Sequence, residues 1–338
     1  MRRSDHCASQ PHVDVNHWFI PGGHDSLPGK RLVVTRSGAA CRRECRTRGP
    51  AGVVVGQGPT GALRLDGAHS LGIWAAGVVV GLRTLRKEPV LGLKRLALPV
   101  SYWRSVEFAY VWRQLKQPAG ARILDVGSPK DLAAMLARHK SYQVVATDLL
   151  PEAVLLSRRY ASAQRLEGRD PGRVHSEVQD GRALTYADGS FDAAYSVSVL
   201  EHIPDSGDSA AIRELIRVVR PGGVVVVTVP YDRNYRETFV KGPVYERKPI
   251  GSEAIFYERH YDRETLAKRL LSSDAAEVVD LSFWGEGVVR TEALLDRLGP
   301  LRLPLSPVEA LLSTVLLRQV EPDGSGHPMA AFFTLRRL

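Results

Sequence analysis

The stretch ARILDVGSPKDLAAMLARHKSYQVVATD, residues 121–148, contains two short apolar runs on either side of a helical pattern. Ala121–Val126 and Gln143–Thr147 are too short for most helices and suit buried strands. Between them, Asp131–His139 carries apolar residues at helical spacing. A strand, a helix and a second strand of these lengths predict a βαβ unit, and therefore a parallel sheet.

The same alternation continues toward the C-terminus. Helices are expected at 152–165, 210–219 and 262–271, and further strands at 174–179, 191–196, 224–229, 277–283 and 329–335. With the first two strands this makes seven. We therefore predict an α/β fold with a doubly wound, mostly parallel sheet covered by helices on both faces.

The N-terminal flank has a different character. Residues 90–117 show near-helical spacing of apolar side chains, and Leu71–Leu82 is an apolar run too short to span roughly 30 Å of hydrocarbon. We expect the segment 71–120 to form helices that pack on a domain comprising 121–338. Residues 1–70 are rich in Gly, Pro, Arg and Ser without sustained periodicity, which predicts a disordered arm.

This arm is basic. It holds ten Lys and Arg residues against five acids, a net charge of +5 out of +9 for the whole chain. Nucleic acid or an anionic membrane surface could attract it, and a solvated tail explains the same composition. All three cysteines, Cys7, Cys41 and Cys45, lie here without the spacing of a zinc finger, so we expect no metal site and a cytoplasmic location.

Small and acidic residues follow the predicted strands at their carboxyl ends, the edge at which open parallel sheets bind ligands. Asp148, after the second strand, can accept both hydroxyls of a ribose, and Asp180, after the third, can accept a hydrogen bond from an adenine amine. Gly127, after the first, lets the backbone approach a ligand closely. Together these positions predict an adenosine-bearing ligand.

Four segments resemble the class I S-adenosylmethionine-dependent methyltransferases, in particular their type 11 small-molecule group. They are ILDVGS (123–128), VVATDLLPEAV (144–154), QDGRALTYADGSFDAAYSVSVLEHI (179–203) and RELIRVVRPGGVVVVTVP (213–230). The resemblance implies a Rossmann-like sheet with an antiparallel last strand, S-adenosylmethionine as cofactor and methyl transfer as the activity. The cofactor contacts expected from strand ends and resemblance together are Asp125, Gly127, Ser128, Lys130, Asp148, Leu149, Asp180, Gly181, Ser196 and Val197.

The first loop departs from the family pattern of three alternating glycines. Gly127 is present, but Pro129 and Asp131 occupy the other two places. The run from Ser128 to Asp131 is typical of a helix start, with Ser as N-cap and Pro at the first helical position. We expect the helix N-terminus and Lys130 to face the carboxylate of the cofactor's methionyl end. The alternative is a degenerate loop in a non-catalytic, cofactor-binding or scaffold protein.

A base is needed for methyl transfer only where the acceptor must lose a proton. His202 follows the fourth strand, Tyr231 follows the fifth, and His260 lies in the segment FYERHYD (256–262). These three are the candidate catalytic residues. A structural role explains His202 equally well.

Two segments, 231–261 and 284–328, are long relative to a minimal fold of this kind, and the second contains two apolar amphipathic stretches. We predict helical cap insertions over an apolar pocket, and hence a small, partly apolar acceptor. Core packing, peripheral membrane contact and a homodimer contact are other uses of such helices. A nucleic-acid acceptor is the less favoured alternative, because 196–205 (SVSVLEHIPD) lacks the Asn/Asp-Pro-Pro-Tyr signature of many such enzymes.

Overall fold

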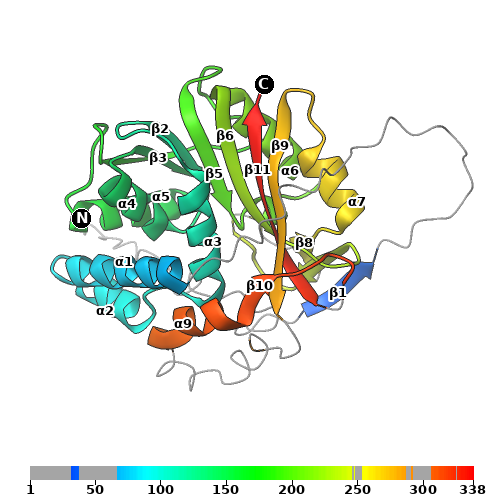
Figure 1. Ribbon diagram of the computed structural model, residues 1–338, viewed down its shortest axis with the longest axis horizontal. Coiled ribbons are helices and arrows are strands. Elements are labelled where there is room, and N and C mark those ends of the chain that lie inside the picture. The colour runs from blue at the N-terminus through cyan, green and yellow to red at the C-terminus, as the bar shows by residue number, and fades with distance from the viewer. Residues whose placement is uncertain are drawn as a thin grey trace, which may run out of the picture.

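A computed structural model describes residues 32–37, 67–245, 247, 253–286, 291, 306–324 and 326–338. At its centre is an eight-stranded sheet with the order β10-β9-β11-β6-β5-β2-β3-β4 (Figure 1). Its strands are β2 (Arg122–Val126), β3 (Gln143–Asp148), β4 (Val174–Val178), β5 (Phe191–Val197), β6 (Val219–Pro230), β9 (Ala276–Glu286), β10 (Leu317–Gln319) and β11 (His327–Arg337).

The strand directions agree with a doubly wound sheet. β4, β3, β2, β5 and β6 pair in parallel, and β11 is antiparallel to both β6 and β9. The expected fold class, including its antiparallel last strand, is therefore confirmed. The short strand β10, antiparallel to β9, is an eighth strand that we did not predict. Strand order reverses between β2 and β5, which places a ligand-binding crevice at their carboxyl ends.

Helices cover both faces of this sheet, and their apolar sides form two clusters of buried residues. The strands between them are buried on both faces, which explains their continuous apolar runs. On one face lie α3 (Tyr102–Gln114), α4 (Lys130–Lys140) and α5 (Pro151–Ala163). On the other lie α6 (Gly207–Val218) and α7 (Arg263–Leu266), the latter continued by a π-helical turn at Ala267–Leu271.

The N-terminal helices belong to the same core as the sheet. α1 (Gly67–Leu85) and α2 (Pro89–Ala97) precede α3, and Ile73, Val80 and Leu91 join the buried cluster of the first face. The helical pattern over 90–117 divides at Pro99, because the residue before a proline is disfavoured in the helical region. In Figure 1 these helices and α9 (Ser306–Leu316) lie at the lower end, opposite the head of the reversed strand β11. This end is where the parallel strands terminate.

The insertion at 231–261 differs from the predicted helical cap. It contains β7 (Arg236–Val240) and β8 (Ile255–His260), which pair in antiparallel fashion. β1 (Leu32–Ser37) adds to β7 and completes a separate three-stranded sheet. The arm expected to be disordered over 1–70 therefore contains a strand and the start of α1. The hydrogen bonds that one segment forms with a distant one are not visible in local periodicity, which is why the sequence missed this sheet.

Other expectations fall wholly or partly outside the described residues. The three cysteines lie there, as does all but one residue of the first helix expected in 284–328, at 291–298. The second helix expected there corresponds to α9. None of the helices in the described part of the chain is long and apolar enough to cross a bilayer.

Candidate active site

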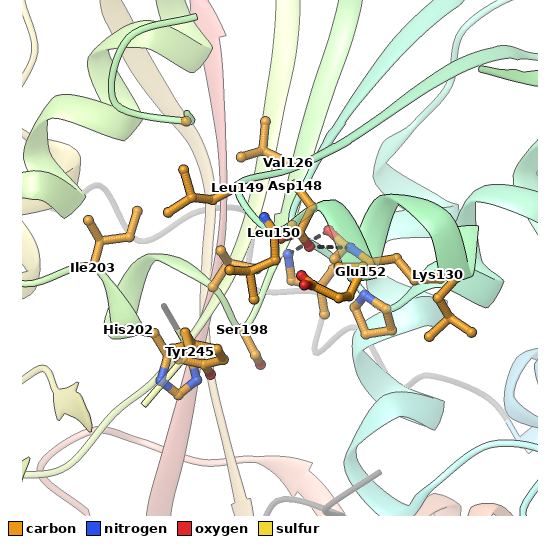
Figure 2. Close-up of a pocket in the computed structure, with 18 of the residues that line it drawn as sticks. Val126, Lys130, Asp148, Leu149, Leu150, Glu152, Ser198, His202, Ile203 and Tyr245 are labelled. Carbon is orange, nitrogen blue, oxygen red and sulfur yellow. Dashed lines mark hydrogen bonds and ion pairs between the residues drawn. The ribbon is translucent and has the colours of Figure 1, made fainter. Parts of the chain in front are cut away.

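A cavity of about 980 Å³ opens at the carboxyl ends of β2, β3, β4 and β5 (Figure 2). One side is lined by the segments that follow these strands: 126–131, 148–153, 179–182 and 197–199. The opposite side is lined by residues from α2 and α3, by His202–Pro204 and by residues of 243–257. Eight of the ten expected cofactor contacts line the cavity on the side of the strand ends: Gly127, Ser128, Lys130, Asp148, Leu149, Asp180, Gly181 and Val197.

Gly127 occupies a backbone conformation that requires glycine. Its φ is +71°, and a Cβ atom at this position would lie 2.7 Å from Cγ1 of Val199. Its N–H donates to the carbonyl of Thr147, 2.9 Å away, which ties the end of β2 to β3. Any side chain here would be strained and would collide with the side chain of Val199.

A helix begins close to the predicted position, but the predicted roles of Ser128 and Pro129 are wrong. α4 begins at Lys130, and Pro129 rather than Ser128 occupies the N-cap position, without a side-chain capping bond. The hydroxyl of Ser128 instead accepts a hydrogen bond from the backbone N–H of Val197 at 3.0 Å. Ser128 therefore joins the loop after β2 to the end of β5 and does not cap the helix.

We expected Lys130 to face the carboxylate of the cofactor's methionyl end, but it pairs with an acid of the neighbouring strand. Its Nζ lies 2.6 Å from Oδ2 of Asp148, the acid predicted to bind a ribose (Figure 2). The other oxygen of Asp148 accepts from the N–H of Leu150 at 3.0 Å. An ionised carboxylate has about four acceptor positions, so both oxygens retain capacity for hydroxyl donors.

Asp180 is held by Arg182. Nε of Arg182 lies 2.9 Å from Oδ1 and Nη2 lies 2.7 Å from Oδ2. This bidentate contact holds the pKa of Asp180 below its usual range. Asp180 and the adjacent Gly181 line the cavity next to the end of β4, where an adenine ring would lie in the expected arrangement.

Asp125 and Ser196 do not line the cavity. Asp125 is buried within β2 and accepts from the N–H of Ser128 at 3.1 Å, and burial raises its pKa to about 6. Ser196 is fully buried and donates to the carbonyl of Val126 at 3.0 Å. Both side chains stabilise the loop after β2 through hydrogen bonds on the side away from the cavity. The structure therefore does not place them where they could contact a ligand directly, as we had expected.

His202 lies on the cavity wall with its ring orientation set by Tyr257. Its Nδ1 is 2.9 Å from the carbonyl oxygen of Tyr257, and since a carbonyl only accepts, Nδ1 carries the proton. In the neutral ring Nε2 is then the unprotonated nitrogen, 3.8 Å from Oε1 of Glu201. Burial lowers the pKa of His202, which favours this neutral form, and burial raises the pKa of Glu201 well above its usual range.

The structure does not bring Tyr231 and His260 to the cavity. The Tyr231 ring packs on Phe283, 4.6 Å between centroids, and the residue is 2% exposed. His260 is buried between Arg236 and Glu258, at 3.1 and 3.3 Å. β8 therefore contributes Tyr257 to the cavity wall but not His260. Thr238 of β7 pairs with Glu258 and Phe239 pairs with Phe256, so Tyr257 is the extra residue of an irregularity in the pairing.

Several residues of the wall near His202 escaped the sequence analysis. They include Arg104 from α3, Ser198 after β5, and Tyr245 and Arg247 from the segment between β7 and β8. Figure 2 shows His202, Tyr245 and Ser198 gathered on one side of the cavity and Lys130 and Glu152 on the other. One local signal was available: Glu107, which bonds Arg104, is a lone acid within the otherwise apolar run Val106–Val111.

Part of the chain is similar in sequence to known methyltransferases. Residues 124–227 match the family model of a methyltransferase domain. Over 126 residues the chain is 35% identical to a ubiquinone biosynthesis O-methyltransferase from Xanthomonas axonopodis pv. citri, covering 37% of this chain and 49% of that relative. Over 123 residues it is 34% identical to a 2-methyl-6-phytyl-1,4-hydroquinone methyltransferase from Synechocystis sp., covering 36% of this chain and 34% of that relative.

The matched stretch thus spans half or less of the length of these relatives. Among solved structures, a SAM-dependent methyltransferase from Methanosarcina mazei is 19% identical to the chain, with a TM-score of 0.43. That match covers 68% of this chain and 96% of the other.

Proposed function

Because residues 124–227 form a class I S-adenosylmethionine-dependent methyltransferase domain of the type 11 group, we propose that the chain transfers a methyl group from S-adenosylmethionine to a small, partly apolar acceptor. The observation that carries this proposal is one continuous cavity that joins the ends of β2, β3, β4 and β5 to an aromatic and apolar wall. A cofactor and an acceptor can meet there end to end.

The cofactor half of the proposed site follows the strand ends. Asp148 would accept from the ribose hydroxyls, and Asp180 with Gly181 would border the adenine. The backbone at Gly127 and the start of α4 would face the methionyl end, where helix N–H groups favour a carboxylate. The bound cofactor supplies an electrophilic methyl group, and the chain orients it toward the opposite wall.

The part of the cavity opposite the strand ends would bind the acceptor, and its lining suits a molecule with an apolar surface. Leu98, Phe108 and Ile203 line it together with the rings of Tyr245 and Tyr257. A pocket of this kind, with few polar groups among apolar ones, is typical of small-molecule sites. Where the acceptor is a hydroxyl, Nε2 of His202 would receive its proton.

Titration calorimetry with S-adenosylhomocysteine tests the cofactor site. We expect binding by the wild-type chain and at least about tenfold weaker binding by Asp148→Ala, since charge-assisted hydrogen bonds contribute about 1.5–3 kcal/mol. Asp188→Ala is the matched control, because Asp188 is exposed and pairs with Arg217 away from the cavity. An Asp148→Ala protein that stays folded by circular dichroism and binds like the wild type would contradict the proposed site.

A further inference from the structure

We propose that the acceptor carries an anionic oxygen group, a carboxylate or a phosphate, which binds Arg104 and Arg247 at the His202 end of the cavity. This inference rests on the proposed function and names the class of acceptor that the cavity selects.

The charges on the cavity wall are divided between its two ends. Its acidic lining residues, Asp131, Asp148, Glu152 and Asp180, all lie on the segments after β2, β3 and β4. Three of them pair with cations: Asp131 with Arg95 of α2 at 3.0 Å, Asp148 with Lys130 at 2.6 Å, and Asp180 with Arg182 at 2.7 Å. The wall around His202 presents two guanidinium groups and, among the described lining residues, no carboxylate.

Arg104 is held in place by a buried anchor. Its Nη1 donates to Oε2 of Glu107 at 2.6 Å. The other oxygen of Glu107 accepts from the hydroxyls of Ser198, at 2.6 Å, and Thr228, at 2.9 Å. A guanidinium has five N–H donors, so this bond leaves capacity for a bidentate contact with a carboxylate or phosphate. The Arg104 side chain is 30% exposed, whereas that of Glu107 is 5% exposed, so the cation and not its anchor reaches the cavity.

Arg247 approaches the same end of the cavity from the segment between β7 and β8. Its Nη2 donates to the carbonyl of His202 at 3.4 Å. The rings of Tyr245 and Tyr257 lie 5.5 and 5.2 Å from the His202 ring, between centroids. This end therefore combines flat apolar surfaces with two cations, which suits an aromatic or similarly planar acid.

The carboxylate of the cofactor itself is the competing occupant of Arg104. The start of α4 and the nearby Arg95, which contacts Asp131 in the first turn of that helix, are better placed for it. Arg104 is linked through Glu107 to Ser198, directly after β5, and not to the loop after β2. The two assignments predict different effects of an Arg104 substitution, so an experiment can separate them.

The test compares 4-hydroxybenzoate, 4-hydroxybenzamide and 4-hydroxyphenyl phosphate as probes, by calorimetry with and without S-adenosylhomocysteine. We expect the wild type to prefer an anionic probe to the amide by about tenfold, the scale of one charge-assisted contact. Arg104→Gln and Arg247→Gln should each reduce this preference at least about threefold. Arg104→Lys, which keeps the charge, should retain part of it. Arg113→Gln is the matched control, since Arg113 lies in the last turn of the same helix and outside the cavity wall.

The outcomes separate the two proposals. If the phosphate binds more tightly than the benzoate, the acceptor's anionic group is a phosphate, and if the benzoate binds more tightly, it is a carboxylate. Equal affinity for the benzoate, the phosphate and the amide, or no binding of any probe, would overturn the anionic acceptor and leave the methyltransferase proposal intact. If Arg104→Gln weakens S-adenosylhomocysteine but not 5′-methylthioadenosine, which lacks the carboxylate, Arg104 serves the cofactor and the inference is wrong. If S-adenosylhomocysteine fails to bind, the proposed function fails, and the probes still decide the anion site on the protein alone.

Discussion

Among single residues, His202 has the most direct chemical consequence, because its Nδ1–H tautomer decides which ring nitrogen can accept a proton. The Tyr257 carbonyl holds the proton on Nδ1, so the ring can accept a proton only through Nε2. Burial lowers its pKa from the ordinary 6.5, so the neutral ring predominates at pH 7. A hydroxyl acceptor would thus meet a base that is already in the required state.

NMR can check this tautomer directly. We expect ¹⁵N spectra at pH 7 to show His202, assigned with a His202→Ala protein, as the neutral Nδ1–H form, with a titration midpoint below 6.5. Turnover of a hydroxyl acceptor should fall as the pH drops through that midpoint, because protonation removes the Nε2 lone pair. His202→Ala should lower kcat by about 10²–10⁴ and leave S-adenosylhomocysteine affinity unchanged. A midpoint above 6.5 or an Nε2–H tautomer would rule out this role.

At the scale of elements, a buried ion cluster joins α6, β8 and the π-helical turn. Arg259 Nη1 lies 2.6 Å from Oδ2 of Asp208, and both side chains are fully buried. Asp208 also accepts from Tyr261 at 2.8 Å and from Arg269 at 2.6 Å. Burial pushes the pKa of Asp208 upward, but the bonds from Arg269 and the charge of Arg259 outweigh it, and the pKa is lowered overall. The cluster holds the small sheet, and with it Tyr257, against the central domain.

Asp208→Asn should therefore be strongly destabilising, because it removes the nearer counter-charge of the buried Arg259, at 2.6 Å, and leaves it the more distant Glu237, at 3.9 Å. We expect a loss of about 3–5 kcal/mol in the free energy of unfolding, measured in urea at pH 7. Since the folded-state pKa of Asp208 is depressed, its contribution is present above the unfolded value near 3.8 and is lost as the pH falls below it. Asp188→Asn, in an exposed ion pair, is the control and should change stability by about 0–1 kcal/mol. A similar small effect for both variants would contradict the role of the cluster.

At the scale of the whole molecule, the N-terminal helices complete the domain that the family match covers only in part. Tyr110 of α3 donates to Asp280 at 2.7 Å and packs on Phe332, with ring centroids 5.3 Å apart. Tyr102 donates to Glu286 at 2.8 Å. α3 therefore covers one face of the sheet beside β9 and β11 and at the same time supplies Arg104 to the cavity.

A chain of residues 118–338 should consequently fail to fold cooperatively, because the sheet face under α3 would be exposed to water. We expect circular dichroism to show no cooperative thermal transition for it. A chain of residues 67–338 retains α1 to α3 and should keep a transition close to that of the full chain. A sharp transition in the shorter chain would show that the sheet domain is independent of these helices.

The succession of strands and helices in the central sheet and the cofactor side of the cavity follow from local sequence. Strand and helix periodicities are set by neighbouring residues, and the carboxyl ends of parallel strands necessarily share one edge. For this reason Gly127, Asp148 and Asp180 could be placed from the sequence alone. The role of Ser128 could not, and the predicted capping was wrong, since its hydroxyl accepts from the N–H of Val197, 69 residues away.

The acceptor side depended on the tertiary structure. Arg104, His202 and Arg247 come from three separate segments, and only packing brings them to one wall. The irregular pairing of β8 with β7 leaves Tyr257 on the cavity wall and His260 between Arg236 and Glu258, and the packing after β6 places Tyr231 against Phe283. The pairing of β1 with β7 likewise joins distant segments. Local patterns thus determine the helices and most strands of the central sheet, while long-range contacts form the small sheet and decide which side chains reach the cavity.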